Sequence, residues 1–199
     1  MAPTGPIIGI LLAAGRGRRF GSDKLCHPLA DGQPMAVAAA RHLQPACDRL
    51  IAVLRPDSQA LARELAALGC EPVFCPAADA GMGYSLASGI RAAPEAAAWI
   101  VALADMPFIA PSTHHRVAEA LRAGHTVVTV DFHGQRGHPV GFSQVCGELL
   151  ASLSGDQGGR RVIAAFAAQT LRVTVDDPGV IHDIDHPADL IRAGKLACD

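Results

Sequence analysis

The stretch IIGILLAAGRGRRFGSDKL, from Ile7 to Leu25, begins as a nearly unbroken apolar run and continues into a glycine-rich loop with three arginines and a lysine. A short apolar run that ends in turn signals is typical of a strand buried on both faces. The same pattern recurs at Leu50–Leu54 and Trp99–Leu103, with longer alanine- and leucine-rich segments between the runs. This alternation predicts a three-layer, doubly wound, Rossmann-like α/β fold with a mostly parallel sheet.

The expected elements follow that alternation along the chain. The expected strands are Ile7–Leu12, Leu50–Leu54, Pro72–Cys75, Trp99–Leu103, Thr126–Asp131, Pro139–Phe142 and Leu171–Val175. The expected helices are Pro34–His42, Ser58–Leu68, Ser85–Ala93, Ser112–Ala123, Gly147–Leu153 and Arg160–Ala168, with Ser112 as the expected N-cap of its helix. In a fold of this kind ligands bind at the carboxyl ends of the strands, so the segments that directly follow strands are the informative ones.

Composition limits the class of protein. Half of the 199 residues are hydrophobic, 18% are charged and the net charge is −2. A single folded domain over residues 1–199 is therefore expected, with no overall attraction to nucleic acid or acidic membranes. The six cysteines form no CxxC pair, which disfavours a zinc site or a disulfide framework. Reduced thiols in a cytoplasmic protein are expected instead.

Three interpretations of the first loop compete: a phosphate cradle, a signal peptide, or a strand exit with solvated arginines. The apolar run from Ile7 is too short to span a membrane, and its positive charges follow it instead of preceding it as in a signal peptide. The loop matches neither the P-loop nor the dinucleotide-binding pattern. Gly15 and Gly17 would nevertheless let backbone amides approach an anion, and Arg19 and Lys24 could neutralise a triphosphate from two sides.

The loop pattern LAAGxGxRxGxxK resembles that of the MobA/MocA-like nucleotidyltransferases that activate molybdopterin, which are similar to the cytidylyltransferases of isoprenoid synthesis. The resemblance extends over nearly the whole chain. It implies that the loop backbone holds the base and ribose, and that Arg19 and Lys24 hold the phosphates. The nucleotide-binding residues that it implies are Leu12, Ala13, Ala14, Gly15, Gly17, Gly81, Gly83 and Ser85. Arg16 and Arg18 stand where the pattern varies, so solvated side chains are expected there.

The segment GMGYSL, residues 81–86, resembles the family's GMGxSL turn, which closes over the base and leads into a helix. Gly81 and Gly83 would allow close backbone approach, and Ser85 could cap the helix or bond a ligand. A glycine turn with an N-cap serine is also common without any ligand.

The segment LADMP places Asp105 just beyond a buried strand, where a carboxylate needs a partner. The resemblance implies that Asp105 binds Mg²⁺ beside the phosphates; the alternative is a turn cap at Pro107. Magnesium takes one or two carboxylates together with phosphate oxygens. The segment IHDIDHPADL resembles the family's DIDTPEDL, which implies a second metal contact at Asp185, with His186 where threonine is usual. His182 and His186 would share a metal only on a helix, so a transition-metal site is not expected.

The segments GQRGHPVGF and SGDQGGRRV resemble family segments that lie near the acceptor. The acceptor-binding residues that they imply are Gly137, His138, Pro139, Asp156 and Arg160. A glycine loop that opens a helix leaves free amides that can hold an anion. Plain connecting turns are the alternative at each of these positions.

The family reaction moves a nucleoside monophosphate from a triphosphate to a phosphate-bearing acceptor and releases pyrophosphate. Such an acceptor is largely dianionic near neutral pH and needs no protein nucleophile, in keeping with the lack of a convincing Ser-His-Asp or Cys-His pattern. The resemblance implies Mg²⁺ as cofactor and Arg19, Lys24 and Asp105 as catalytic residues. It leaves room for a transient contact with a molybdoenzyme or its chaperone.

The identity of the nucleotide depends on one methyl group. The guanylyl branch of the family reads LAGG and the cytidylyl branch LAAG, as here, and the methyl of Ala14 would narrow the base pocket. CTP with molybdopterin as acceptor is therefore the preferred interpretation. A GTP-dependent or sugar-phosphate nucleotidyltransferase stays open, as does a non-catalytic nucleotide-binding module.

Overall fold

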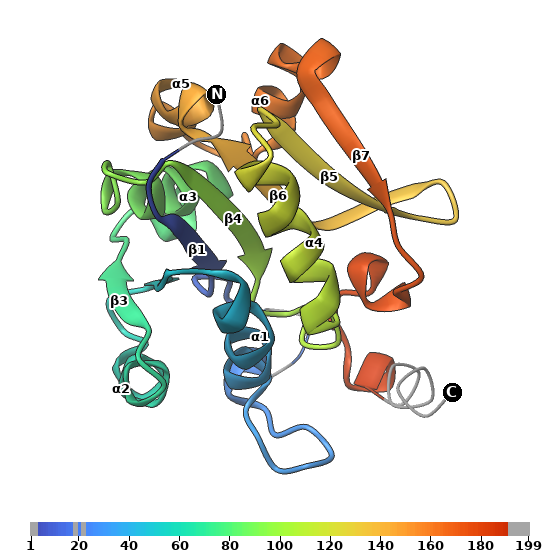
Figure 1. Ribbon diagram of the computed structural model, residues 1–199. Helices are drawn as coiled ribbons and strands as arrows, with labels where there is room; N and C mark the ends of the chain where they lie inside the picture. The colour runs from blue at the N-terminus through green and yellow to red at the C-terminus, as the bar shows by residue number, and fades with distance from the viewer. Residues whose placement is uncertain (1–3, 18–19, 21–22, 191–199) are drawn as a thin grey trace.

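The computed structural model describes residues 4–17, 20 and 23–190, and within these residues the chain forms one seven-stranded sheet (Figure 1). The strand order is β3-β2-β1-β4-β6-β5-β7. The strands are β1 (Ile7–Leu12), β2 (Arg49–Leu54), β3 (Glu71–Phe74), β4 (Ala98–Leu103), β5 (Val127–Phe132), β6 (Gln135–Ser143) and β7 (Thr170–Thr174). The doubly wound α/β fold with a mostly parallel sheet is thereby confirmed.

The strand directions bring the functional segments to one edge of the sheet. Strands β1, β2, β3 and β4 pair in parallel, so their carboxyl ends meet there. Strand β6 runs antiparallel to both β4 and β5, with Val101 opposite Val140. Because β6 runs the other way, its beginning lies beside the end of β4. The segment around His138 therefore reaches the same edge as the loops that follow β1 and β4.

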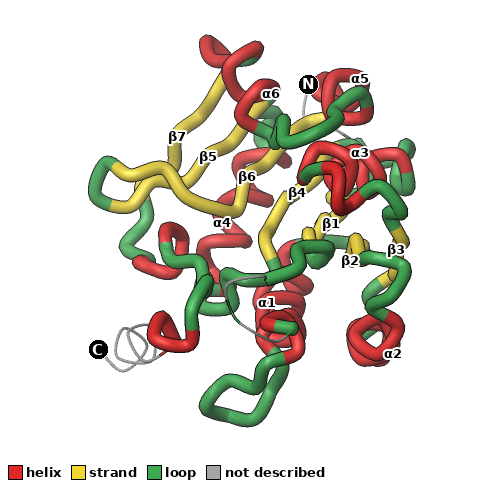
Figure 2. Tube along the Cα trace, turned by 180° about the vertical axis from the view of Figure 1, so that it is seen from behind, coloured by secondary structure: helices red, strands yellow, loops and turns green. Residues whose placement is uncertain are grey.

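Helices cover both faces of the sheet. They are α1 (Met35–Leu43), α2 (Gln59–Ala67), α3 (Met82–Arg91), α4 (Pro111–Arg122), α5 (Gly147–Ala151) and α6 (Arg160–Ala165). Side chains of β1 alternate between the faces: Ile7 and Leu11 pack with α1, α2 and α4, whereas Ile8 and Ile10 pack with α3, α5 and α6. Figure 2 shows α3, α5 and α6 in front of the sheet, with α1 and α4 behind it.

Helices α1 and α2 begin one residue later than expected, and two other helix starts change the expected roles of serines. Helix α4 begins at Pro111 with Ala110 as N-cap, one residue before Ser112, because a proline is well suited to the first helical turn. Helix α3 begins at Met82 with Gly81 as N-cap. Ser85 therefore lies within the helix and caps no helix end.

Two further observations concern the whole described chain. No described helix combines the length and the apolar character that crossing a membrane requires. Five cysteines carry free thiols, and Cys198 lies outside the described residues.

His114 on α4 provides a test of the core through pH. Its ring is buried, and burial, together with the nearby His42 and His115, lowers the pKa of His114 from 6.5 to about 3. Between pH ~6.5 and pH ~3, His114 is therefore protonated in the unfolded chain but neutral in the folded chain. We expect the stability of the wild type to fall as the pH drops from ~6.5 towards 3, and His114→Phe to flatten that fall.

Urea unfolding at several pH values measures this effect. His125→Gln, a change at an exposed histidine just beyond α4 that does not contribute to the His114 shift, serves as the control and should keep the wild-type slope. If the free energy of unfolding depends on pH equally in the wild type and in His114→Phe, the lowered pKa of His114 is contradicted.

Candidate active site

Three charged side chains meet at the carboxyl edge of the sheet. Lys24 begins the short 3-10 helix η1 (Lys24–Cys26), and its side chain is only 6% exposed. Its Nζ donates to Asp105 Oδ2 at 2.8 Å, to Asp185 Oδ1 at 2.8 Å and to the carbonyl of Ile184 at 3.1 Å. Asp105 follows β4 and Asp185 lies in the chain's closing segment. The fold thus joins residues separated by up to 161 positions.

Lys24 is a cation at neutral pH. Burial lowers the pKa of its ammonium, but the charges and hydrogen bonds of Asp105 and Asp185 outweigh burial, so the pKa is raised above its ordinary value. Two carboxylate oxygens converge on one cationic nitrogen. This donor set also suits a magnesium ion, which binds one or two carboxylates plus phosphate oxygens. The described residues hold no cluster of three or more potential metal-binding side chains, so a ligand would have to complete such a site.

A cavity of about 160 Å³ lies directly beside this charged cluster. Three parts of the chain contribute to its wall: the end of β1 and its loop, the beginning of α3, and the end of β4. The lining residues are Leu12, Ala14, Gly15, Lys24, Leu25, Ala78, Met82, Ser85, Leu103 and Asp105. Six of these are among the residues proposed from the sequence to bind the nucleotide, its phosphates or the metal.

A larger cleft of about 640 Å³ adjoins the small cavity and shares Leu12, Met82 and Leu103 with it. Gly137, His138, Asp156 and Arg160, four of the five residues assigned to the acceptor from the sequence, line it. Its apolar wall consists of Leu86, Val101, Val140, Phe142 and Ile163, and its charged rim of Arg136, Arg160, Arg172, Asp156 and Asp183. A ligand with an apolar face and an anionic group would suit this lining.

His138 is the most buried polar group that lines the cleft. Burial lowers the pKa of its imidazole, although the Asp105 carboxylate acts in the other direction. Within the described part of the chain, its Nδ1 is buried without a hydrogen-bond partner. A neutral imidazole has one donor and one acceptor nitrogen, and the His138 side chain lines the cleft.

Gly81 and Gly83 contact protein backbone. A Cβ on Gly81, whose φ is +134°, would lie 2.1 Å from the carbonyl carbon of Gly155, and a Cβ on Gly83 would lie 2.7 Å from the carbonyl oxygen of Ser154. The Gly83 N–H donates to the Gly155 carbonyl at 2.8 Å. These glycines therefore hold the start of α3 against the loop that carries Asp156, and so link the walls of the two cavities.

The remaining proposed residues lie differently. Ala13 is buried and its N–H donates to Val53; neither it nor Pro139 lines either cavity. Gly17 packs on Lys24, since a Cβ there would lie 2.7 Å from Lys24 Cγ. Arg19 lies outside the described residues, and so does Arg18.

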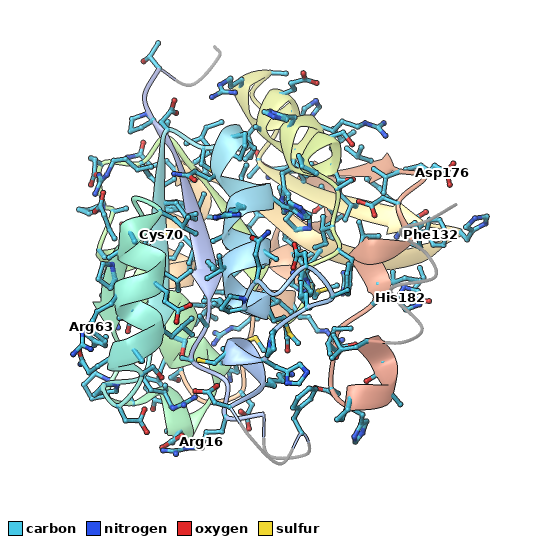
Figure 3. The ribbon with its side chains drawn as sticks, turned by 90° about the horizontal axis from the view of Figure 1, so that it is seen from below. Arg16, Arg63, Cys70, Phe132, Asp176 and His182 are labelled. Atoms are coloured by element: carbon cyan, nitrogen blue, oxygen red, sulfur yellow. The ribbon has the colours of Figure 1, made fainter. Side chains whose placement is uncertain are left out.

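The other charged positions singled out from the sequence are peripheral. Arg16 is 44% exposed, as expected, but it forms an ion pair with Asp79 on the 3-10 helix η3 (Ala78–Ala80). Figure 3 shows it at the edge of the molecule, well away from His182. His182 Nδ1 lies 2.6 Å from the Pro178 carbonyl, and residues 182–185 form no helix. The two histidines of the closing segment therefore form no metal pair on a helix.

Three arginines that received no role from the sequence also lie at or near the site. Arg136 and Arg172 reach the larger cleft from β6 and β7. Arg55 follows β2 and bonds to the loop after β1. Arg136 belongs to the segment GQRGHPVGF, whereas Arg55 and Arg172 lie in no quoted motif. The position of all three arginines depends on strand pairing, which local sequence does not reveal.

Comparisons with known proteins identify the family of the chain. The family described as the MobA-like NTP transferase domain matches residues 9–173, and the chain belongs to that family. The purine catabolism protein PucB of Bacillus subtilis is 30% identical over 94% of this chain and 96% of its own length. The bifunctional protein GlmU of Rhodopseudomonas palustris is 32% identical over 86% of this chain but only 37% of its own length.

Among solved structures, Rv0371c of Mycobacterium tuberculosis is 28% identical and superimposes with a TM-score of 0.81, covering 94% of this chain and 97% of that one. The same mycobacterial protein has also been solved as a complex with manganese, with a TM-score of 0.77, 27% identity and the same coverage. The resemblance to the MobA-like nucleotidyltransferases is thus confirmed at the level of family and fold.

Proposed function

We propose that the chain is one nucleotidyltransferase domain that moves CMP from CTP to molybdopterin, with Mg²⁺ as cofactor and release of pyrophosphate. The observation that carries this proposal is the Lys24–Asp105–Asp185 cluster beside the small cavity, which the larger cleft adjoins. The small cavity would hold the nucleoside, and the larger cleft the acceptor. The proposal includes a cytoplasmic location, in keeping with the free thiols.

The reaction joins an acceptor phosphate oxygen to the α-phosphorus of CTP and breaks the bond from that phosphorus to the bridging oxygen of the β-phosphate, which leaves with pyrophosphate. Bound at Asp105 and Asp185, Mg²⁺ would polarise the α-phosphate as a Lewis acid. Lys24, held as a cation, would neutralise charge that develops on the leaving pyrophosphate, and the same role is proposed for Arg19. The dianionic acceptor needs no general base, so positioning and charge neutralisation account for the catalysis.

The acceptor cleft suits a large, flat, phosphorylated molecule. Its apolar wall can cover a ring system, and Arg136, Arg160 and Arg172 can hold an anionic group. His138 lines the cleft, so its imidazole would bond a polar atom of the acceptor. The acidic residues Asp156 and Asp183 at the rim can accept hydrogen bonds from hydroxyl groups, which is the feature that keeps a sugar phosphate open as the alternative acceptor.

Support for CTP comes from the narrow nucleoside cavity. Ala14 is 7% exposed and lines it, and the cavity measures only about 160 Å³. A smaller pyrimidine base fits beside the Ala14 methyl more readily than a purine does. A single methyl group is worth about 1–3 kcal/mol of discrimination, so GTP should be a poorer substrate and not an excluded one. The divalent metal is supported by the manganese complex of the mycobacterial relative.

The test of this proposal is release of pyrophosphate from CTP or GTP in the presence of Mg²⁺ and each candidate acceptor. Release that needs molybdopterin and is faster with CTP supports the proposal. Faster release with GTP would move the protein to guanylyl transfer, and release that needs a sugar phosphate would replace the acceptor. Binding of a nucleotide without release, with every acceptor tried, would indicate a non-catalytic binding module.

Gly15→Ala is expected to weaken binding of Mg-CTP by roughly tenfold or more without lowering the melting temperature. Among the described residues, a Cβ on Gly15 meets no atom within 4 Å, so the added methyl should collide with a ligand that approaches the loop closely. Calorimetric titration and a thermal melt measure the two effects. Gly83→Ala is the contrasting variant. Its added methyl would collide with the Ser154 carbonyl, so this variant should have a lower melting temperature. Unchanged affinity in Gly15→Ala would place the nucleotide elsewhere.

A further inference from the structure

Arg55 is a buried guanidinium next to the loop that follows β1. Strands β1 and β2 are neighbours, with Leu12 opposite Val53, so the residue just beyond β2 emerges beside that loop. Arg55 is 8% exposed, and its Nη1 donates to the carbonyl oxygen of Gly15 at 2.8 Å and to that of Ala14 at 3.3 Å. It therefore bonds two consecutive peptide groups of the loop.

Carboxylates fix the orientation of this guanidinium. Its Nε donates to Asp57 Oδ1 at 3.0 Å, and its Nη2 lies 4.0 Å from Asp23 Oδ2. Two of the nitrogens, Nε and Nη1, thus donate hydrogen bonds in different directions, and Nη2 faces a more distant carboxylate. A planar guanidinium can satisfy such a set at once, whereas a lysine ammonium has a single point of charge and no fork. The arrangement depends on arginine and not on positive charge alone.

The geometry of the peptide bond determines where the N–H groups of this loop point once Arg55 holds the carbonyls. In a trans peptide the N–H points opposite to the C=O of the same group. When Arg55 holds the carbonyls of Ala14 and Gly15, the N–H groups of Gly15 and Arg16 point away from Arg55. No described residue accepts a hydrogen bond from either N–H group. Ala14 and Gly15 line the small cavity and Arg55 does not.

We propose that Arg55 is a positioning residue, which holds two carbonyls on one side of the loop so that the N–H groups of Gly15 and Arg16 face the nucleotide on the other. This inference rests on the proposed function, because it takes the small cavity as the nucleotide site. Two N–H groups that are oriented before the ligand arrives donate to its acceptor oxygens without losing loop entropy on binding. Arg55 itself touches no substrate.

The test is calorimetric titration of Mg-CTP into Arg55→Met, Arg55→Lys and wild type. Arg55→Met is expected to weaken binding roughly tenfold, equivalent to 1.4 kcal/mol, while kcat in the pyrophosphate assay stays within about twofold. Arg55→Lys keeps the positive charge but not the forked guanidinium, so its affinity for Mg-CTP should lie between those of Arg55→Met and the wild type. Arg49→Met is the matched control: Arg49 begins the same strand at the opposite edge, is exposed, and pairs with Glu71 and Glu95. It should bind as wild type.

A second measurement does not depend on how well the variants fold. In wild-type protein labelled with ¹⁵N, saturating Mg-CTP should shift the amide signals of Gly15 and Arg16. Wild-type affinity in Arg55→Met, or amide signals that stay in place while CTP binds, would overturn the role of Arg55 and leave the proposed function standing. Failure of wild type to bind any nucleoside triphosphate would overturn both.

Discussion

Asp105→Ala is expected to lower pyrophosphate release by roughly a thousandfold or more while leaving the fold intact. Asp105 supplies one of the two carboxylate oxygens around Lys24 and is one quarter exposed, with no hydrogen bond to the core elements. Its removal therefore takes away a ligand of the proposed Mg²⁺ site, while Lys24 keeps Asp185 and the Ile184 carbonyl as partners. Steady-state kinetics together with a thermal melt measure the two effects.

The matched control is Asp48→Asn at the other edge of the sheet. Asp48 accepts a hydrogen bond from the N–H of Ile7 at 2.8 Å, which an asparagine can still accept. The Asp48→Asn substitution removes one negative charge, as Asp105→Ala does, but lies away from the site. It should leave the rate of pyrophosphate release unchanged. A rate near that of the wild type in Asp105→Ala would remove this carboxylate from the mechanism.

Lys24→Met should lower kcat/KM by about 10²–10³-fold, the loss typical of one group that stabilises charge in a transition state. The side chain is buried against two carboxylates, and its cation is the only described one within hydrogen-bonding distance of both. Methionine fills a similar space with no charge, so the loss reports on the charge. Because both carboxylates remain, Mn²⁺ alone should still bind to Lys24→Met but should bind poorly to Asp105→Ala.

Arg41→Gln, which removes an exposed cation on α1, provides the control for overall charge. It should leave kcat/KM within about twofold of the wild type. If kcat/KM is unchanged in Lys24→Met, this lysine has no role at the phosphates, and the pairs with Asp105 and Asp185 are structural ion pairs.

The buried strands could be predicted because their side chains are apolar on both faces. The expectation of Ile7–Leu12 matches β1 residue for residue, and those for β2 and β4 differ only in their first residue. The prediction was weaker for β6, which begins at Gln135 and not at Pro139. Its first half is polar and pairs with β5 where the chain is exposed, so no apolar run marks it.

The candidate site could be predicted in its residue types but not in its contacts. The motifs around Lys24, Asp105 and Asp185 named the charged residues, yet only the folded chain brings the three together. Arg55 could not be found, because its contact with the first loop depends on the pairing of β1 with β2. Gly81 was expected to approach a base, whereas its backbone lies against Gly155. A role at the base for this residue stays a prediction.

The central claim is that the Lys24–Asp105–Asp185 cluster binds the metal and phosphates of a nucleoside triphosphate. Its most direct test is calorimetric titration of CTP and GTP into wild-type protein, with Mg²⁺ and with the ion chelated, and into Asp105→Ala. The account predicts binding that requires Mg²⁺, favours CTP and is lost in Asp105→Ala. Nucleotide binding that is equally tight without the metal and in Asp105→Ala would contradict it.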